Sequence, residues 1–522
     1  MTRALGVAAS GHKETSKAAR IILEEGGNAF DAVLGAMCAA CVCEPMLASL
    51  GGGGFLLAQT AAGDSCVHDF FTQTPSATHD ELDFYPIQAD FGTATQEFHI
   101  GMGSIAVPGV VAGLFSVHQV HGSMPLDKIM EPAVWLAREG VRVNKLQMYI
   151  NEVLKPIITA SPGAMAFATP MFAPGRLAEI GEFISNPDLA DTFEALASHG
   201  SRWFYEGEPA QQLVRDCVEN GGVISTQDMQ RYEVILRDPV TVESHGARIS
   251  VNSPPSPGGC LTVFALSLLD KIKPGQHTWG DPQHAMALGR VMRAASLVRR
   301  QTGMTSGLDD DTAARILGPE SLQQWHKTLL TGALASRGTT HISVADSAGN
   351  LASLTLSNGE GSAYVLPQSG IMMNNMMGEE DLNPDGFHRL PPGVRLASMM
   401  TPTIMGLPDG GWLALGSGGS NRIRSAILQV LTNLLEFGMD IEQAVKAPRL
   451  HLENRHMNVE AGFADATLDA LQREWPGVER WPGTNLFFGG VHAVQRSADG
   501  SFLAAGDPRR GGAVAFAKGQ ST

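Results

Sequence analysis

The sequence lacks the features of several common classes of protein. No run of basic residues offsets its formal net charge of −16, so a polyanion would be repelled and nucleic-acid binding is not expected. The opening stretch, MTRALGVAASGHKETSKAA, has no apolar core of a secretory signal. The longest apolar run lies between Asp31 and Glu44 and is shorter than the roughly 20 residues that span a bilayer. These absences predict a soluble, cytoplasmic protein with no membrane or nucleic-acid partner.

Cysteine is sparse, and no CxxC pairs repeat with the spacing of a zinc site. Cys38, Cys41 and Cys43 lie in the apolar stretch AVLGAMCAACVC, which is typical of a buried helix, so we expect free, buried thiols there. His451 and His456 are not at the helical spacing of metal ligands and are expected to be ordinary surface residues. The sequence therefore predicts neither a metal nor an organic cofactor.

Two frequent active-site signatures are also missing. No GxSxG elbow occurs, which argues against a serine α/β-hydrolase. The glycine run in SLGGGGF (49–55) lacks the Lys-Ser/Thr of a phosphate loop and the spacing of a dinucleotide-binding loop. We expect this run to provide close backbone packing beside an active site instead of nucleotide binding.

The periodicity of apolar residues predicts a layered α+β fold. Helical spacing predicts helices at 14–25, 31–43, 109–121, 282–299 and 421–437, and strands are predicted at 65–71, 240–252, 490–495 and 502–505. HISVADSAGNLASLTLSN and TPTIMGLPDGGWLALGS each predict two strands joined by a tight turn. With no low-complexity linker or solenoid repeat, we expect one structural domain with helices outside and antiparallel sheets inside.

The segment Gly338-Thr339-Thr340-His341 is the most promising chemical motif. A Thr pair at the start of a strand is ordinarily explained by β-propensity alone. Gly338, however, permits a tight bend and presents an unhindered carbonyl to the Thr339 hydroxyl. Attack there and hydrolysis of the resulting ester would expose an α-amine on Thr339 with a pKa of about 7.7–8.0. Such an amine is a general base built into its own nucleophile.

Two glycine-rich segments provide what acyl transfer needs. GSGGS (416–420) joins a strand to a helix, where backbone N–H groups and the helix dipole can stabilise an oxyanion, each donor being worth about 3–4 kcal/mol. SNGEGS (357–362) follows a strand, and its small polar side chains can orient the Thr339 hydroxyl. The alternatives are a plain strand–helix turn and a solvated loop, respectively.

Many segments in register resemble the γ-glutamyltranspeptidase family of N-terminal-nucleophile hydrolases. They include EEGGNAFDAV, CEPMLASLGGGGFLL, FYEGEPAQQLV, NGGVISTQDMQRYE, SPPSPGG, TTHISVADSAGN, SGIMMNNMM, LASMMTPTI, GSGGSNRI, FGMDIEQAVKAPRLH and GDPRR. The resemblance implies a four-layer αββα sandwich that cleaves itself between Gly338 and Thr339. It also implies a large subunit, 1–338, that stays associated with a small subunit, 339–522.

The resemblance assigns roles to the catalytic segments. Ser357 stands where the family has a Thr that hydrogen-bonds the nucleophile, and Asn358 is the counterpart of a substrate-binding Asn. Gly418 and Gly419 match the glycines of the oxyanion hole. Thr339, Ser357, Gly418 and Gly419 are thus the predicted catalytic residues.

The departures from the family concern the residues that hold a glutamyl group. His79 stands where the family has a carboxylate-binding Arg, and a single imidazole cannot form that bidentate contact. Met376 replaces a Gln or Glu, an acidic partner survives only as Glu379 or Glu380, and the family Ser-Ser pair is Ala397-Ser398. Arg395, Arg422 and Arg424 offer another anion anchor, although an Arg near a helix start is more often structural.

The predicted function is a self-processing enzyme that hydrolyses or transfers the acyl group of a γ-glutamyl amide such as glutathione. Its partners would be this small-molecule amide and a water or amine acceptor, with Asn358, Glu379, Ser398 and His79 contacting the substrate. The alternatives are an acylase of the same fold acting on a non-glutamyl amide and a binding protein without catalytic activity.

Overall fold

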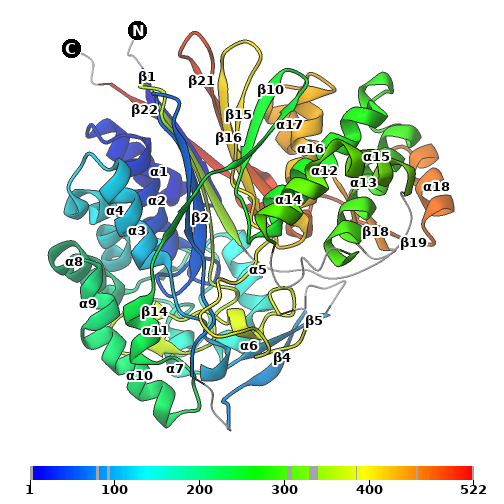
Figure 1. The fold of residues 1–522 in the computed structure, drawn as a ribbon. Coiled ribbons are helices and arrows are strands. Elements are labelled where there is room, and N and C mark those ends of the chain that lie inside the picture. The colour runs from blue at the N-terminus through cyan, green and yellow to red at the C-terminus, as the bar shows by residue number, and fades with distance from the viewer. Residues whose placement is uncertain are drawn as a thin grey trace.

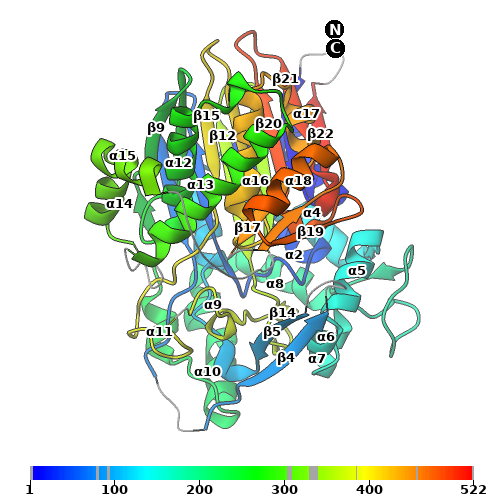
Figure 2. The ribbon, with the colours of Figure 1, turned by 90° about the vertical axis from the view of Figure 1, so that its right-hand side faces the viewer.

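The computed structural model describes residues 4–77, 81–90, 95–301, 308–328, 339–383, 385–453 and 456–519. Two antiparallel sheets form its centre, and helices cover the outer face of each sheet (Figure 1). The view turned by 90° shows the helices of the second half of the chain lying over the second sheet (Figure 2). The predicted α+β, four-layer αββα sandwich is confirmed.

The first sheet has seven strands and places the Thr motif at its middle. Its order is β22 (Ala513–Lys518), β1 (Ala4–Ser10), β11 (Thr340–Asp346), β12 (Leu351–Ser357), β2 (Gly53–Gln59), β3 (Ser65–Phe70) and β8 (Ile235–Arg237). The second sheet has six strands in the order β21 (Phe502–Ala505), β20 (Gly490–Arg496), β16 (Trp412–Gly418), β15 (Thr403–Gly406), β10 (Ala247–Val251) and β9 (Val240–Ser244). Because β11 and β16 are both interior strands, their ends are held by neighbours on two sides.

The helices fall into two outer layers and a lower lobe. Against the first sheet lie α1 (Lys13–Glu24), α2 (Ala29–Cys43) and α3 (Val110–His121), and α4 (Leu126–Glu139) packs on α2. Over the second sheet lie α12 (Pro257–Ile272), α13 (Pro282–Gln301), α16 (Arg422–Leu435) and α17 (Ile441–Lys446). The lower lobe includes α5 (Lys145–Val153), α8 (Pro187–His199), α9 (Ser201–Glu206), α10 (Glu208–Glu219), α11 (Thr226–Arg231), β4 (Tyr85–Asp90) and β5 (Thr95–Ile100).

Helix α2 shows why the first layer forms. All 15 of its residues are buried, including Cys38, Cys41 and Cys43, which are free thiols as predicted. A helix that is apolar on every side is stable only between other layers, and α2 packs against both α1 and the first sheet. Asn28 caps its start by accepting the backbone N–H groups of Phe30 and Asp31.

The structure corrects two features of the predicted strand pattern. Segment 240–252 is a hairpin of β9 and β10 instead of one strand, because His245 and Gly246 adopt φ values of 51° and 75° and turn the chain. Strands β1 and β22, which continue the first sheet beyond β11, were not predicted, since their alanine-rich sequences carry little alternation. Among the described helices, none has the length and apolarity required to cross a membrane.

Candidate active site

Thr339 lies at the start of β11, an interior strand of the first sheet. It directly precedes β11, and only 4% of its surface is exposed. The antiparallel register pairs Thr340 with Leu356, so the next position places Ser357 across from Thr339. The predicted nucleophile and its predicted hydrogen-bonding partner are thus neighbours at one end of the sheet.

A small cavity opens at this end. Its volume of about 30 Å³ holds about two waters, so entry of any acyl donor requires the lining side chains to move. The lining is Phe71, Thr339, Ser357, Met376, Glu379, Asp381, Leu382, Ser398, Met399, Met400, Ser420 and Ile423. Four of the predicted site residues, Thr339, Ser357, Glu379 and Ser398, therefore share one cavity.

The first glycine of the predicted oxyanion hole, Gly418, packs directly against Thr339. Gly418 ends β16, and a Cβ atom at this position would overlap the Thr339 carbonyl oxygen. Gly419 follows with φ of 119°, a conformation that L-residues rarely adopt. Helix α16 begins three residues later, at Arg422, so its N-terminal dipole lies near the same backbone turn.

Arg510 is a site residue to which the sequence assigned no role. Its Nη1 atom donates to the Thr339 carbonyl oxygen at 3.1 Å, and its Nη2 atom donates to Leu486 O at 3.3 Å. Burial lowers the pKa of Arg510 to about 10, which leaves it cationic at neutral pH. The Asp-Pro-Arg-Arg run is the signal that could have identified it, because an Asp-capped turn followed by Arg fixes the direction of the side chain.

The turn that carries Arg510 is held by buried ion pairs. Asp507 Oδ1 accepts the Arg509 backbone N–H at 3.0 Å and caps the short helix η5 (Pro508–Arg510). The Arg509 guanidinium contacts Glu460 at 2.5 Å, and the Asp507 carboxylate also contacts Arg449 at 2.6 Å. These groups are almost entirely buried, so they fix the turn, and with it Arg510, relative to Thr339.

Glu44 lies on the other side of the strand start. Its Oε1 atom accepts a hydrogen bond from Thr340 Oγ1 at 3.2 Å. Burial raises the pKa of Glu44 to about 7, while the Thr340 hydrogen bond and the charge of Arg510 oppose the shift. A carboxyl group with a pKa near neutral pH thus hydrogen-bonds Thr340, the residue next to the predicted nucleophile, Thr339.

A buried polar layer follows Thr339 between the two sheets. His341 Nδ1 lies 2.8 Å from Thr355 Oγ1, and its Nε2 lies 2.9 Å from Ser343 Oγ. Ser343 Oγ in turn donates to His492 O, in the second sheet, at 3.1 Å. Burial lowers the pKa of His341 well below its usual value, so the ring is neutral. This network fixes β11 against the second sheet immediately below Thr339.

Of the remaining residues predicted to contact substrate, Ser398 lines the cavity and Asn358 does not. Asn358 is fully buried, its side-chain amide has no hydrogen-bond partner in the described chain, and it does not line the cavity. Ser398 does line it, with Oγ accepting the Met400 N–H at 3.1 Å. His79 and Gly338 lie outside the described residues.

The arginines considered as another anion anchor do not line this cavity. Arg395 donates to Phe71 O and to Glu233 O, which makes it a structural residue. Arg422 donates to Phe487 O at 2.7 Å, and Arg424 is buried elsewhere along α16. The described lining therefore contains the carboxyl groups of Glu379 and Asp381 but no arginine or lysine.

The surface prediction for His451 is wrong. The side chain is buried, with Nδ1 2.7 Å from Ser425 Oγ and Nε2 3.1 Å from Glu453. The strand β17 (Leu450–Glu453), which was not predicted, carries it inward. His456 is exposed, as predicted.

The four-layer fold and a Thr at the start of a central strand, beside a glycine turn, define an N-terminal-nucleophile amidohydrolase. The family model of gamma-glutamyltranspeptidase matches residues 15–517. The chain belongs to the gamma-glutamyltranspeptidase family.

Curated relatives carry two kinds of name. Glutathione hydrolase 2 of Arabidopsis thaliana is 31% identical over 82% of this chain and 77% of its own length. The glutathione hydrolase proenzyme of Escherichia coli (strain K12) is 28% identical, over 94% and 87%. The acylase ACY 1 proenzyme of Pseudomonas sp. (strain SE83) is also 28% identical, over 96% and 91%.

Solved structures share the fold. A cephalosporin acylase from Bacillus halodurans superposes with a TM-score of 0.83 at 22% identity, over 99% of this chain and 96% of its own. The Helicobacter pylori gamma-glutamyltranspeptidase gives 0.55 at 25% identity, over 63% and 93%.

Proposed function

We propose that the chain is a self-processing amidohydrolase that acts on γ-glutamyl amides such as glutathione. Cleavage between Gly338 and Thr339 produces subunits 1–338 and 339–522, which remain associated through the shared first sheet. The observation that carries this proposal is the contact between the Gly418 backbone and Thr339, at a cavity shared with Ser357 and Ser398.

The proposed reaction proceeds through an acyl-enzyme. The α-amine of Thr339 accepts the hydroxyl proton, and Oγ attacks the carbonyl of the donor amide. The N–H groups of Gly418 and Gly419 stabilise the oxyanion, and Ser357 orients the hydroxyl. The amine leaves, and water or an acceptor amine then attacks the ester and releases the acyl group.

The acidic lining supports a donor with a positively charged amine. Glu379 is 5% exposed, and both it and Asp381 lie in the same cavity wall as Thr339. In a poorly solvated site, paired carboxyl groups favour an α-ammonium group, which γ-glutamyl compounds carry. Ser398 supplies a hydroxyl in the same wall, whereas Asn358 lies outside the cavity lining.

An acylase for a non-glutamyl amide is the second candidate. Met376, Met399 and Met400 give the cavity a flexible apolar wall, and no described lining residue is a cation that could hold an α-carboxylate. Acylases are also among the relatives with similar coverage. This version uses the same catalytic residues and differs only in the acyl group.

Hydrolysis of γ-glutamyl-p-nitroanilide beside matched p-nitroanilides of simple acyl groups separates the two candidates. Purified wild-type protein should release p-nitroaniline from the γ-glutamyl compound, and Thr339→Ala should not. Turnover of the simple acyl compounds alone would favour the acylase. Failure of every anilide, by protein shown to be cleaved, would argue against both.

A further inference from the structure

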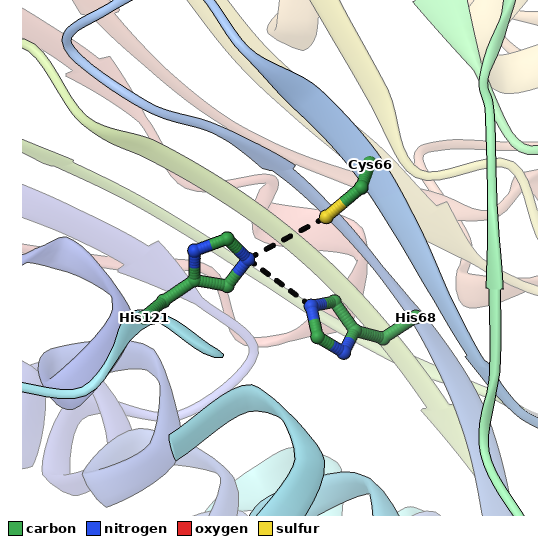
Figure 3. A group of neighbouring side chains, drawn as sticks. All are labelled: Cys66, His68 and His121. Carbon is green, nitrogen blue, oxygen red and sulfur yellow. Dashed lines mark hydrogen bonds between the residues drawn. The ribbon is translucent and has the colours of Figure 1, made fainter. Parts of the chain in front are cut away.

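Three side chains that can ligate a metal converge outside the lining of the cavity at Thr339. Figure 3 shows Cys66 and His68 on strand β3 and His121 at the end of helix α3, with their ligand atoms facing one another. The His121 Nε2 atom lies 3.1 Å from His68 Nε2 and 3.5 Å from Cys66 Sγ. All three ligand atoms lie within 4.8 Å of one another.

The local structure explains why these side chains meet. Cys66 and His68 are two residues apart on a strand, so they point to the same face, toward the helices. His121 is the last residue of α3, and its carbonyl accepts a hydrogen bond from the Asn28 side chain at 2.8 Å. Its ring stacks on Phe30 at 4.4 Å, which restricts its rotation.

The second ring nitrogen of His68 has its own partner. His68 Nδ1 lies 3.0 Å from Ser116 Oγ, on α3. Metal-binding histidines almost always bond through one nitrogen while the other is held by a polar group, which fixes the tautomer and the ring. If Nδ1 donates its proton to Ser116 Oγ, the lone pair lies on Nε2, the atom that faces His121.

The observed separations match a tetrahedral ion. Zinc bonds to nitrogen at about 2.0–2.1 Å and to sulfur at about 2.3 Å, so tetrahedral ligands are separated by about 3.3 Å for two nitrogens and about 3.6 Å for nitrogen and sulfur. The distances of 3.1 Å and 3.5 Å therefore need changes of only a few tenths of an ångström. In the ion-free protein both distances are hydrogen bonds of His121 Nε2, and a bound ion would replace them.

We propose that Cys66, His68 and His121 bind one zinc ion, with its fourth position open to water. His68 is fully buried while Cys66 and His121 are half-buried, so the ion reaches the ligands from the surface. The bonds would join β3 to the end of α3. The site is independent of the amide chemistry, since none of the three residues lines the cavity at Thr339.

A second group, His245, Asp270 and Glu436, also brings its ligand atoms within 4.8 Å of one another, but its geometry differs. His245 Nδ1 lies 3.5 Å from Asp270, whereas His245 Nε2 lies 3.2 Å from Glu436. The two carboxyl groups face opposite nitrogens of one ring, and a single ion binds only one of those nitrogens. The cluster of His245, Asp270 and Glu436 therefore provides a control for the experiment.

Cobalt titration of the chelator-treated, reduced full-length protein tests the proposal. Wild type should bind one Co²⁺ per protein molecule and show a near-ultraviolet thiolate-to-cobalt charge-transfer band. One equivalent of Zn²⁺ should displace the cobalt and abolish the band. Cys66→Ala should remove the band, and His121→Gln should weaken Co²⁺ binding by at least about 100-fold, the upper range for loss of a supporting partner. His121 is half-buried and glutamine is similar to it in size, so the His121→Gln variant should fold. It keeps the test valid if Cys66→Ala misfolds.

The matched controls are Cys217→Ala, which removes a buried thiol elsewhere, and His245→Ala, in the cluster with Asp270 and Glu436. Both should retain the band and the one-to-one stoichiometry. Absence of the band in folded wild-type protein would overturn the proposal. Its persistence in Cys66→Ala, or its loss in His245→Ala, would also overturn it. Far-ultraviolet circular dichroism establishes that each variant is folded, independently of amidase activity.

Discussion

The two faces of strand β11 are built from different chemistry. Toward the helices, Ile342 and Val344 pack in an apolar core with α2. Toward the second sheet, His341 and Ser343 form a fully buried polar network. Apolar packing is non-directional and tolerates small shifts, whereas hydrogen bonds fix distances and angles. The comparison teaches that the helix-facing side stabilises the strand, and the inter-sheet side positions Thr339.

The largest expected effect comes from removing the hydroxyl at the head of the polar face. Thr339→Ala should leave the chain uncut and lower the turnover of any amide substrate by at least about 10⁴-fold, because one group serves both reactions. Thr339→Ser retains a hydroxyl and should still be processed. Denaturing gels and anilide assays measure both effects; a cleaved, active Thr339→Ala protein would show that another residue is the nucleophile.

Adjacent substitutions on β11 compare its two faces directly. His341→Ala leaves a cavity and removes the ring that bonds the Thr355 and Ser343 hydroxyls, of which Ser343 keeps its bond to His492 O. It should therefore lower the free energy of unfolding by about 3 kcal/mol or more and slow processing. Ile342→Val, on the apolar face, should cost about 1 kcal/mol and leave processing unchanged. Urea unfolding and the rate of appearance of the two subunits provide the readouts. Equal costs at the two positions would contradict the difference between the faces.

Glu44 is a polar residue on the otherwise apolar, helix-facing side of β11. The pH dependence of stability tests its contribution. Its pKa rises from 4.5 to about 7 on folding, so the native state holds a proton that the unfolded chain has released in that window. Glu44 therefore contributes stability below pH 4.5 that is lost as the pH rises to about 7, by up to about 3 kcal/mol. Relative to Glu44→Gln, which does not titrate, the wild type should become progressively less stable across this window.

The measurement is the difference in free energy of unfolding between wild type and Glu44→Gln at a series of pH values. Glu25→Gln, at an exposed position, is the matched control and should give a constant difference from wild type. A constant difference for Glu44→Gln as well would mean that this carboxyl does not titrate between pH 4.5 and 7.

Arg510→Lys should give the smallest of these effects. A lysine carries one ammonium group and cannot reach both Thr339 O and Leu486 O as the guanidinium does. We expect kcat to fall about tenfold with little change in KM, because the contact is made to the nucleophile and not to substrate. Steady-state kinetics measures both constants. A change confined to KM would place Arg510 at the substrate instead.

Much of the site was predictable because its parts are local in sequence. The Thr motif, the SNGEGS loop and the GSGGS turn each carry their signal within a few residues, and the hairpin register then places Ser357 opposite Thr339. Arg510 and Glu44 were missed because their roles arise only when segments more than a hundred residues away meet Thr339 and Thr340. No local periodicity encodes such contacts.

The same limit applies to the fold. The β15–β16 hairpin and the helices over the second sheet follow from clear periodicity, whereas β1 is a strand because it pairs with β11, and β22 is a strand because it pairs with β1. Cys66, His68 and His121 illustrate a further case: the first two have strand spacing, but only the end of α3 brings the third residue within reach. Zinc-finger spacing rules therefore do not detect this cluster.

Intact mass spectrometry of the purified protein tests the central claim most directly. The account predicts two chains, with the smaller beginning at Thr339, and a mass shift on that smaller chain when an acyl donor is trapped. A single uncut chain with full amidase activity would contradict it.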